Sequence, residues 1–412
     1  MTTDAAPQVT PTATEPGPGP DGEARHWVDP KRRAWMTGLV VPLLPFAAWG
    51  LVEATGLAVF WWLGPVFIMA ILPAIDALVG TDPSNPPEWA VPQLEADRYY
   101  RIATYLYLPL QFAALVWATW YVAAHDLSWP SMVGFALTMG TVSGVAINTA
   151  HELGHKRDRL ERRLSKVALA PTGYGHFYVE HNRGHHSRVS TPEDPASSRF
   201  GESFWEFLPR TVLGSLRSAW AIEAAALRRK GHRVLSPRND VLNAWALSVV
   251  LFGGLVAAFG LEVVPFLAIQ AVFGFSLLEV VNYVEHYGLL RQKVANGRYE
   301  RCQPEHSWNS NHVASNLALY NLERHSDHHA NPTRRYQSLR HFEEAPQLPS
   351  GYAGMITLAW ITPLWRRVMD HRVIEHYDGD ITKVNIDPSK REKVLARYGV
   401  TAGTDSTRES DR

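Results

Sequence analysis

Six long runs without a charged side chain constrain the fold of this 412-residue chain more than any other feature. An α-helix needs about 20 predominantly apolar residues to cross the hydrocarbon core of a bilayer. Five of the runs reach about that length, and the last does so if it continues through Glu279 toward Val284. The sequence therefore predicts an all-α integral membrane protein with six transmembrane helices in three hairpins, at residues 34–52, 54–75, 102–124, 127–150, 241–261 and 263–284.

Lysine and arginine residues gather on one side of these predicted spans. Lys31, Arg32 and Arg33 precede the first span, and Arg98 and Arg101 separate the second span from the third. The three turns on the opposite side contain neither lysine nor arginine. Because cytosolic loops of membrane proteins are enriched in these two residues, both termini are expected in the cytosol.

The sequence outside the spans divides into a disordered N-terminal tail, two cytosolic segments and a disordered C-terminal tail, at residues 1–30, 151–240, 287–400 and 401–412. The two cytosolic segments should form a helical cap on a membrane domain that extends over residues 31–400. The apolar stretch 353–365 is too short to span a bilayer and ends beside Arg366 and Arg367. We therefore expect it to lie on the cytosolic surface of the membrane.

Composition excludes several classes of function. Forty basic residues balance forty acidic ones, so net charge gives no support for a nucleic-acid partner. The single cysteine, Cys302, excludes an internal disulfide, a cysteine-rich zinc site and any four-cysteine iron–sulfur or rubredoxin-type centre within this chain.

Nine of the 18 histidines fall in four short stretches near the cytosolic ends of the spans. The four-residue spacing of His151 and His155 puts both rings on one face of a helix, and two other stretches repeat that spacing. Adjacent histidines on a helix point about 100° apart, so the pairs 185–186 and 328–329 can reach two nearby metals. Ligation by imidazole alone favours Fe, Zn, Cu or Ni over Mg or Ca. Since nine imidazoles exceed what one metal takes, the sequence predicts two metal ions, held by His151, His155, His181, His185, His186, His286, His325, His328 and His329.

Four carboxylates adjoin these histidines in sequence. Metal-bound imidazoles usually donate their second N–H to a carboxylate or a carbonyl, which fixes the orientation of the ring. The candidates for this role are Glu152, Glu180, Glu285 and Asp327, with a solvated surface position as the alternative. The other nine histidines lack metal spacing and are interpreted as surface or structural residues, with His312 the first to check.

Three kinds of protein could contain these histidine clusters. The motif His-Glu-x-x-His at residues 151–155 matches zinc proteases, in which the glutamate is a general base, but that interpretation leaves the other clusters unexplained. A metal transporter or sensor is a second alternative, although transport sites lie near the middle of the bilayer. The third is a non-haem oxidase that uses iron, O2 and two electrons on an apolar substrate dissolved in the bilayer.

Four segments make the third interpretation specific. Residues 148–156, 180–186, 282–288 and 324–330 resemble the four histidine motifs of the membrane-bound alkane 1-monooxygenases, or alkane ω-hydroxylases. Further similarity to that family lies in residues 85–88, 173–176, 191–196, 287–293 and 307–312, so that the match extends from about residue 30 to 404. The segment Asn-Tyr-x-Glu-His-Tyr-Gly at residues 282–288 is typical of alkane and xylene hydroxylases rather than desaturases.

The resemblance implies a diiron site in the cap, in which the nine histidines hold two non-haem iron ions. O2 would be the co-substrate, with no haem and no flavin bound to this chain, and a terminal methyl group of an alkane would become a primary alcohol. Alkyl-aromatic methyl groups and fatty-acid ω-positions are the alternative substrates. Glu323 departs from the family, in which glutamine is common there, and would add a negative charge beside the metals.

The resemblance also implies an electron donor and a location. Electrons in that family come from rubredoxin, which is reduced by an NAD(P)H-dependent FAD rubredoxin reductase. With Cys302 as its only cysteine, this chain cannot include a fused rubredoxin, so the donor should be a separate protein. Basic residues within 156–166 and 291–301 are candidates to dock it. The implied location is the bacterial cytoplasmic (inner) membrane, with the metal site on the cytosolic side.

One residue of the second span bears on substrate length. Alignment to the family around residues 71–76 puts Ile68 where some medium-chain members carry a bulky tryptophan that blocks the substrate channel. Ile68 lies seven residues, about 10 Å, from the predicted cytosolic end of the span near Ile75. Because isoleucine leaves more room, the resemblance implies tolerance of longer alkanes. The alternative is that Ile68 faces lipid or another helix.

Overall fold

The computed structural model describes residues 27–400. Within this range the chain is helical, with isolated β-bridges and no β-strand. Six helices are long and apolar enough to cross a membrane, namely Ala34–Thr55, Ala58–Val79, Arg98–Ala124, Trp129–Gly154, Asp240–Phe259 and Leu261–His286. The predicted all-α fold with six spans is confirmed.

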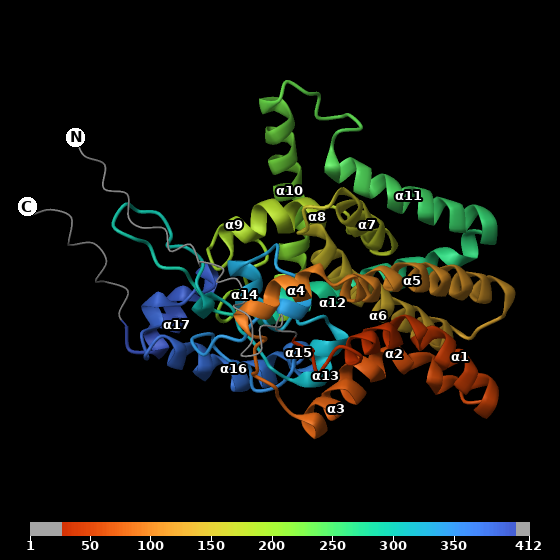
Figure 1. Ribbon diagram of the computed structural model, residues 1–412, viewed down its shortest axis with the longest axis horizontal. Coiled ribbons are helices and arrows are strands. Elements are labelled where there is room, and N and C mark those ends of the chain that lie inside the picture. The colour runs from red at the N-terminus through yellow and green to blue at the C-terminus, as the bar shows by residue number, and fades with distance from the viewer. Residues whose placement is uncertain (1–26, 401–412) are drawn as a thin grey trace, which may run out of the picture.

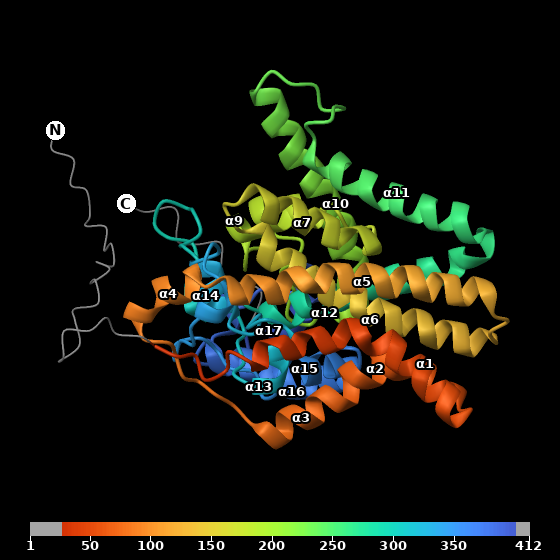
Figure 2. The same ribbon diagram turned by 45° about the vertical axis from the view of Figure 1, so that its right-hand side comes forward.

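Several of these spans are built from shorter helical pieces. The first joins η1 (Ala34–Leu43) to α1 (Leu44–Thr55), and the second consists of η2 (Ala58–Trp62), α2 (Leu63–Val66), η3 (Phe67–Ile71) and α3 (Leu72–Val79). The other spans are α5 (Arg98–Ala124), α6 (Trp129–Gly154), α11 (Asp240–Phe259), and η7 (Leu261–Val263) followed by α12 (Val264–His286). In both Figure 1 and Figure 2, α1, α5, α6 and α11 extend from the remaining helices toward the same end of the molecule.

Two of the observed helices begin earlier than the uncharged runs predicted. Asp97 caps α5 by accepting a hydrogen bond from Tyr99 N at 2.9 Å, so the helix includes Arg98 and Arg101. Asn239 likewise accepts from two backbone N–H groups at the start of α11. A run defined by the absence of charge cannot include Arg98, Arg101 or Asp240. Charged residues at the end of a span are tolerated because their side chains can reach the polar membrane boundary.

Glycines bring α6 and α12 into backbone contact at the centre of the bundle. A Cβ atom on Gly140 would lie 2.8 Å from the carbonyl oxygen of Gln270, and one on Gly144 would lie 2.9 Å from that of Gly274. Gly140 and Gly144 are four residues apart, the small-residue spacing that lets membrane helices approach closely. Ser143, between them, donates a hydrogen bond to Gln270 Oε1 at 2.8 Å. This contact brings the histidine-bearing ends of the two helices together.

The cap consists of further helices between and after the spans. They are α4 (Val91–Ala96), α7 (Arg159–Leu169), α8 (Phe177–Val179), η6 (Glu180–His185), α9 (His186–Arg188), α10 (Phe204–Arg229), α13 (Val313–Ala318), α14 (His325–Ala330), α15 (Tyr352–Ala359), α16 (Thr362–His376) and α17 (Arg391–Arg397). Helix α15 falls within the stretch expected on the membrane surface, but protein encloses it: Ala353, Met355 and Ala359 are fully buried. Thr357 Oγ1 donates to the carbonyl of Met69 in η3, so α15 packs between spans rather than on lipid.

Residues with defined packing precede the predicted domain boundary at residue 31. Asp29, which we assigned to the N-terminal tail, is buried and accepts hydrogen bonds from Trp35 Nε1 at 2.9 Å and Tyr100 OH at 2.8 Å. A carboxylate with two such partners fixes the segment that enters the first span. The rest of the predicted N-terminal tail, up to residue 26, and the predicted tail at residues 401–412 lie outside the described residues.

Candidate metal centre

The nine histidines singled out by their spacing come together in two groups. In each group the candidate ligand atoms lie within 4.8 Å of one another. Two nitrogens on opposite sides of a metal, each about 2.1 Å from it, would be about 4.2 Å apart, so each group has the size of a single metal site. The first group is His151, His155, His181, His186 and His328, and the second is His185, His286, His325 and His329.

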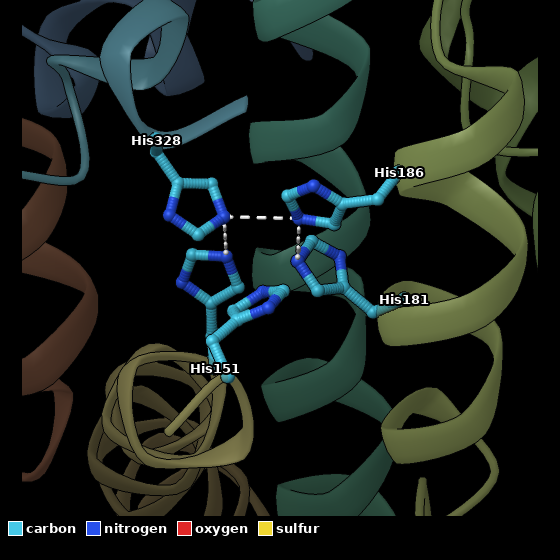
Figure 3. A group of neighbouring side chains, drawn as sticks. His151, His181, His186 and His328 are labelled. Atoms are coloured by element: carbon cyan, nitrogen blue, oxygen red, sulfur yellow. Dashed lines mark hydrogen bonds between the residues drawn. The ribbon is translucent and has the colours of Figure 1, made fainter. Parts of the chain in front are cut away.

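Ring nitrogens in the first group point at one another from three separate segments. His328 Nε2 lies 2.8 Å from His151 Nε2 and 3.1 Å from His186 Nε2, and His186 Nε2 lies 3.1 Å from His181 Nε2 (Figure 3). A neutral imidazole has one N–H, so two facing Nε2 atoms either share a proton or both direct lone pairs at one cation. The arrangement fits a shared cation.

A π-helical turn sets the geometry of the segment 180–186. The spacing predicted that His181 and His185 would share a face of an α-helix, but η6 is a π-helix. Its wider turn places residues five apart on one side, which pairs His181 with His186 in the first group and turns His185 to the second. Isolated π turns are frequent at functional sites. The polar and charged residues of this segment do not reveal from sequence whether its turn is α-helical or π-helical.

Helix α14 keeps ordinary helical spacing and contributes to both groups. His325 and His329, four residues apart, place their Nε2 atoms 2.9 Å from each other in the second group. His328 points instead to the first group. Each adjacent pair, 185–186 and 328–329, therefore has one ring in each group, because neighbouring residues of a helix point in different directions.

Buried nitrogens without partners show that the residues suit a bound metal. The Nε2 atoms of His155, His185 and His286 are buried and make no hydrogen bond within the described chain. A buried polar atom without a partner costs about 1–3 kcal/mol, so one such atom in the first group and two in the second call for a ligand in each. Burial, and after it the neighbouring imidazoles, lower the pKa of His181 and His328 well below the usual value. These rings are thus neutral at neutral pH, the state that binds metals.

One carboxylate that holds a ring of the second group was missed by sequence reasoning. Asp194 Oδ2 lies 2.9 Å from His185 Nδ1 and accepts from Ser197 Oγ at 2.6 Å. Asp194 is nine residues from His185, so adjacency in sequence could not point to it. The signal available was the segment 191–196, which resembled the family but was given no role.

The four carboxylates predicted to orient histidines have different surroundings. Glu285 Oε1 lies 3.2 Å from His325 Nδ1, although the angle is unsuited to a hydrogen bond. The others pair with cations: Glu152 with Lys156 at 3.0 Å, Glu180 with Arg188 at 2.7 Å, and Asp327 with Arg334 at 2.7 Å. Because Glu152 points to Lys156 and the backbone N–H of Tyr336, it is not placed as the general base of a zinc protease.

Several histidines outside the two groups are structural. The carbonyl oxygen of His306 accepts a hydrogen bond from Ser190 Oγ at 2.8 Å. The same oxygen lies 3.4 Å from His286 Nδ1. His312 Nδ1 lies 2.8 Å from Ser310 Oγ, outside both groups. His176 is buried beside Tyr174, with ring centroids 4.3 Å apart. The prediction that they are surface or structural residues agrees with these contacts.

An apolar cavity reaches both groups from inside the bundle. Three histidines form part of its wall: His151 and His181 of the first group and His325 of the second. The remaining lining is largely aliphatic and comes from η3, α6, α12 and α15, and from Phe177, Leu319 and Leu322. Ile68 is 2% exposed and belongs to this lining, so its side chain faces the cavity rather than lipid. The lining also includes Asn148, Asn282 and Glu285, so an unbranched hydrocarbon entering between the helices would meet mainly aliphatic side chains on its way to the histidines.

Glu323 does not add the negative charge that its position suggested. Its carboxyl group is buried and accepts from the Tyr352 N–H at 2.5 Å and from Asn316 Nδ2 at 3.0 Å. Burial raises the pKa of Glu323 to about 8, so the group is largely protonated at neutral pH.

The chain is similar to known proteins over nearly its whole length. Residues 127–359 match the family model described as fatty acid desaturase. The chain is 49% identical over 380 residues to alkane 1-monooxygenase of Acinetobacter baylyi, which covers 91% of this chain and 92% of the relative. It is 47% identical to alkane 1-monooxygenase 1 of Alcanivorax borkumensis, with 94% and 96% covered.

A more distant relative is named for a different substrate. The hydroxylase component of xylene/toluene monooxygenase from Pseudomonas putida is 28% identical over 346 residues, which covers 82% of this chain and 88% of the relative. The resemblance inferred from the histidine motifs is confirmed. This chain belongs to the alkane 1-monooxygenase family, within the larger group that the fatty acid desaturase model describes.

Proposed function

We propose that this protein uses O2 to hydroxylate the terminal methyl group of alkanes at a site with two iron ions. The balanced reaction converts R–CH3, O2, two electrons and two protons into R–CH2OH and water. The observation that carries the proposal is the aliphatic cavity whose wall includes histidines of both groups. The alkane 1-monooxygenase activity for which relatives at 49% and 47% identity are named supports it.

The proposed ligands are the nine histidines, five to one iron and four to the other. Bound iron supplies oxidising power from O2 and two electrons, which zinc cannot do because it has no redox chemistry. Asp194 would hold the ring of His185 in the orientation that turns Nε2 inward, and Glu285 would do the same for His325. The proposal leaves Glu152, Glu180 and Asp327 as structural partners of cations.

The cavity supplies the selectivity in this proposal. Its aliphatic side chains would hold an unbranched chain by burial of apolar surface and would exclude water from the reacting carbon. Ile68, on η3, would set how far the alkyl chain extends away from the histidines. Alkyl-aromatic methyl groups and fatty-acid ω-positions remain the alternative substrates.

We further propose that electrons arrive from a separate rubredoxin, which an NAD(P)H-dependent FAD rubredoxin reductase reduces. Candidate docking residues on the cap are exposed arginines of α7, such as Arg162 and Arg163, and the exposed residues Lys293, Arg298 and Arg301. Lys156 is excluded from this set because it is buried against Glu152. A contact between such charges and an acidic donor should weaken as salt is added.

The proposed location is the bacterial inner membrane, with both termini and the metal centre in the cytosol. Residues 31–400 would then form one membrane hydroxylase domain, with the cap on its cytosolic face. The proposal rests on the lysine and arginine residues at the cap-side ends of the spans. Reporter fusions at the C-terminus test it: a fused fluorescent protein should fold, and a fused periplasmic phosphatase should be inactive.

The decisive experiment combines metal analysis with a coupled assay. Purified protein should contain close to two iron ions per chain and should convert n-alkanes to primary alcohols with rubredoxin, its reductase and NADH. Xylenes and fatty acids in the same assay distinguish the alternative substrates. One zinc ion per chain, with no iron and retained activity, would overturn the proposal.

A further inference from the structure

The end of α10 and the loop that follows it carry a dense positive charge. The segment 228–238 contains six basic residues and no acidic one: Arg228, Arg229, Lys230, His232, Arg233 and Arg238. All but His232 are exposed, and within the described chain none of the six forms an ion pair with a carboxylate. We call this segment the basic loop.

The acidic residues that flank the basic loop in the sequence already form ion pairs with other residues. Glu223, one turn and a half before it on α10, binds Arg183, and so does Asp240, the first residue of α11. Asp240 also accepts from Lys166 at 2.6 Å. Some other arginines of the cap, among them Arg210 and Arg335, pair with a carboxylate in the same way. The basic loop combines six basic residues with no carboxylate partner in the described chain, so its charge is free to bind an external anion.

The basic loop has a defined shape. Asn239 is fully buried, and while its Oδ1 caps α11, its Nδ2 donates to the carbonyl of Val234 at 3.0 Å. Asn243 Nδ2 donates to the carbonyl of Pro237 at 2.9 Å. These two bonds hold the chain on either side of Leu235, which projects outward with 74% of its surface exposed. A held apolar side chain among cations suits an interface between lipid headgroups and acyl chains.

The position of the basic loop in the fold supports the same partner. Figures 1 and 2 show α10 running across the direction of α5, α6 and α11, with its far end and the loop displaced from α14 and the rest of the cap. The loop leads directly into α11, so it lies where the chain enters the membrane. Earlier on α10, Trp205 and Leu213 are also exposed. A helix that runs across the spans and ends in cations next to a span matches an interfacial helix.

We propose that the basic loop binds the headgroups of anionic phospholipids in the membrane leaflet on the cap side. Lys and Arg side chains close to an anionic membrane surface are attracted to its headgroups. Insertion of Leu235 adds burial of apolar surface and separates this site from one for a free anion. The inference goes beyond the proposed hydroxylation and does not depend on it.

Lipid binding to the purified full-length protein tests the proposal. Native mass spectrometry in detergent would compare dioleoyl phosphatidylglycerol with dioleoyl phosphatidylcholine for the wild type, for the triple variant R229Q/K230Q/R233Q and for the control K293Q/R298Q/R301Q. Both variants lose three exposed charges from the same molecule. The wild type should prefer phosphatidylglycerol, the triple variant should lose that preference by about tenfold, and the control should retain it.

The remaining outcomes are equally decisive. An unchanged lipid preference in the triple variant, or an equal loss in the control, would overturn the proposal. Competition by glycerol 3-phosphate would indicate a site for soluble anions and would also overturn it. A raised KM for reduced rubredoxin together with unchanged lipid binding would make the basic loop a protein-docking surface instead.

Discussion

Helices α6 and α11 both have the length of a membrane span, but α6 is enclosed by protein and α11 lies at the outside of the bundle. In the most apolar part of each helix, 83% of the residues of α6 are buried, against 22% for α11. Val249 and Val250 of α11 point outward, whereas the interior of α6 buries polar residues such as Thr138 and Ser143. Figure 1 shows α11 at the edge of the bundle.

This difference explains where a polar site can be built in a membrane protein. A lipid-facing helix must satisfy every polar group within itself, because hydrocarbon offers no partner. The enclosed helix α6 can present Asn148 and His151 to other protein segments, and Asn148 Nδ2 donates to the carbonyl of Leu319. The chemistry therefore concentrates where α6 and α12 are surrounded by the cap. Four pairs of matched changes test this contrast, and in three of them one residue is buried while its control is exposed.

The largest effect is expected at the histidine groups. His151→Ala removes a ring that lies between α6 and α14, and His185→Ala and His328→Ala remove rings from the same centre. Loss of an outer partner of a metal ligand typically costs 10–100-fold, so loss of a ligand should reduce turnover below about 1% and lower the iron content. Full activity in any of the three would require a different ligand set. The matched change His371→Ala, at an exposed position of α16, should leave both quantities near wild type.

The second-largest effect is expected on the selectivity for alkane chain length. Ile68→Trp fills the cavity beside the histidines, so oxidation of long alkanes should fall by about tenfold while short alkanes are spared. Val66→Trp is the control, because Val66 is two residues earlier and 46% exposed. Analysis of the products from n-alkanes of increasing length measures the chain-length profile of both variants. The same profile in the two variants would show that Ile68 does not border the substrate.

These pairs also show how far the sequence could lead. Uncharged runs predicted all six spans, because crossing hydrocarbon imposes one length and one composition on every helix. Spacing predicted which nine histidines come together, because histidines three or four residues apart lie on one face of a helix. Neither argument could divide the nine between the groups, because the π turn of η6 changes which ring faces which way.

Contacts between distant segments were beyond the reach of sequence reasoning. Asp194 supports His185 only because the turn after α9 folds back on η6. Helix α15 was expected on the membrane surface because its length and apolar character suit an interface, and only tertiary packing against α12 encloses it. Ile68 could be placed on a helix, but the face it presents depends on where the neighbouring helices lie.

The close approach of α6 and α12 predicts a smaller effect, on stability. Gly144→Ala would place a methyl group 2.9 Å from the carbonyl oxygen of Gly274, which must separate the helices. Overpacking of this kind costs about 1–3 kcal/mol, so the melting temperature in detergent should fall by several degrees. Gly253→Ala in α11 meets no atom within 4 Å and should be neutral or slightly stabilising, because alanine favours helix by about 1 kcal/mol. Equal melting temperatures for the two variants would contradict the close contact.

The smallest effect is expected for two serines. Ser143 on α6 donates its hydroxyl to Gln270 of α12, whereas the buried hydroxyl of Ser248 on α11 makes no hydrogen bond within the described chain. Ser143→Ala leaves Gln270 Oε1 without this donor and should destabilise the protein by about 1 kcal/mol, in the range of hydrogen bonds between membrane helices. Ser248→Ala removes a buried hydroxyl that has no partner to lose, so it should be neutral or slightly stabilising. Unfolding in a denaturing detergent resolves a difference of this size when both variants are measured with the wild type. If Ser248→Ala proved the more costly of the two, the Ser248 hydroxyl would have a partner that the structure does not show, and the contrast between the enclosed α6 and the outer α11 would fail at its simplest point.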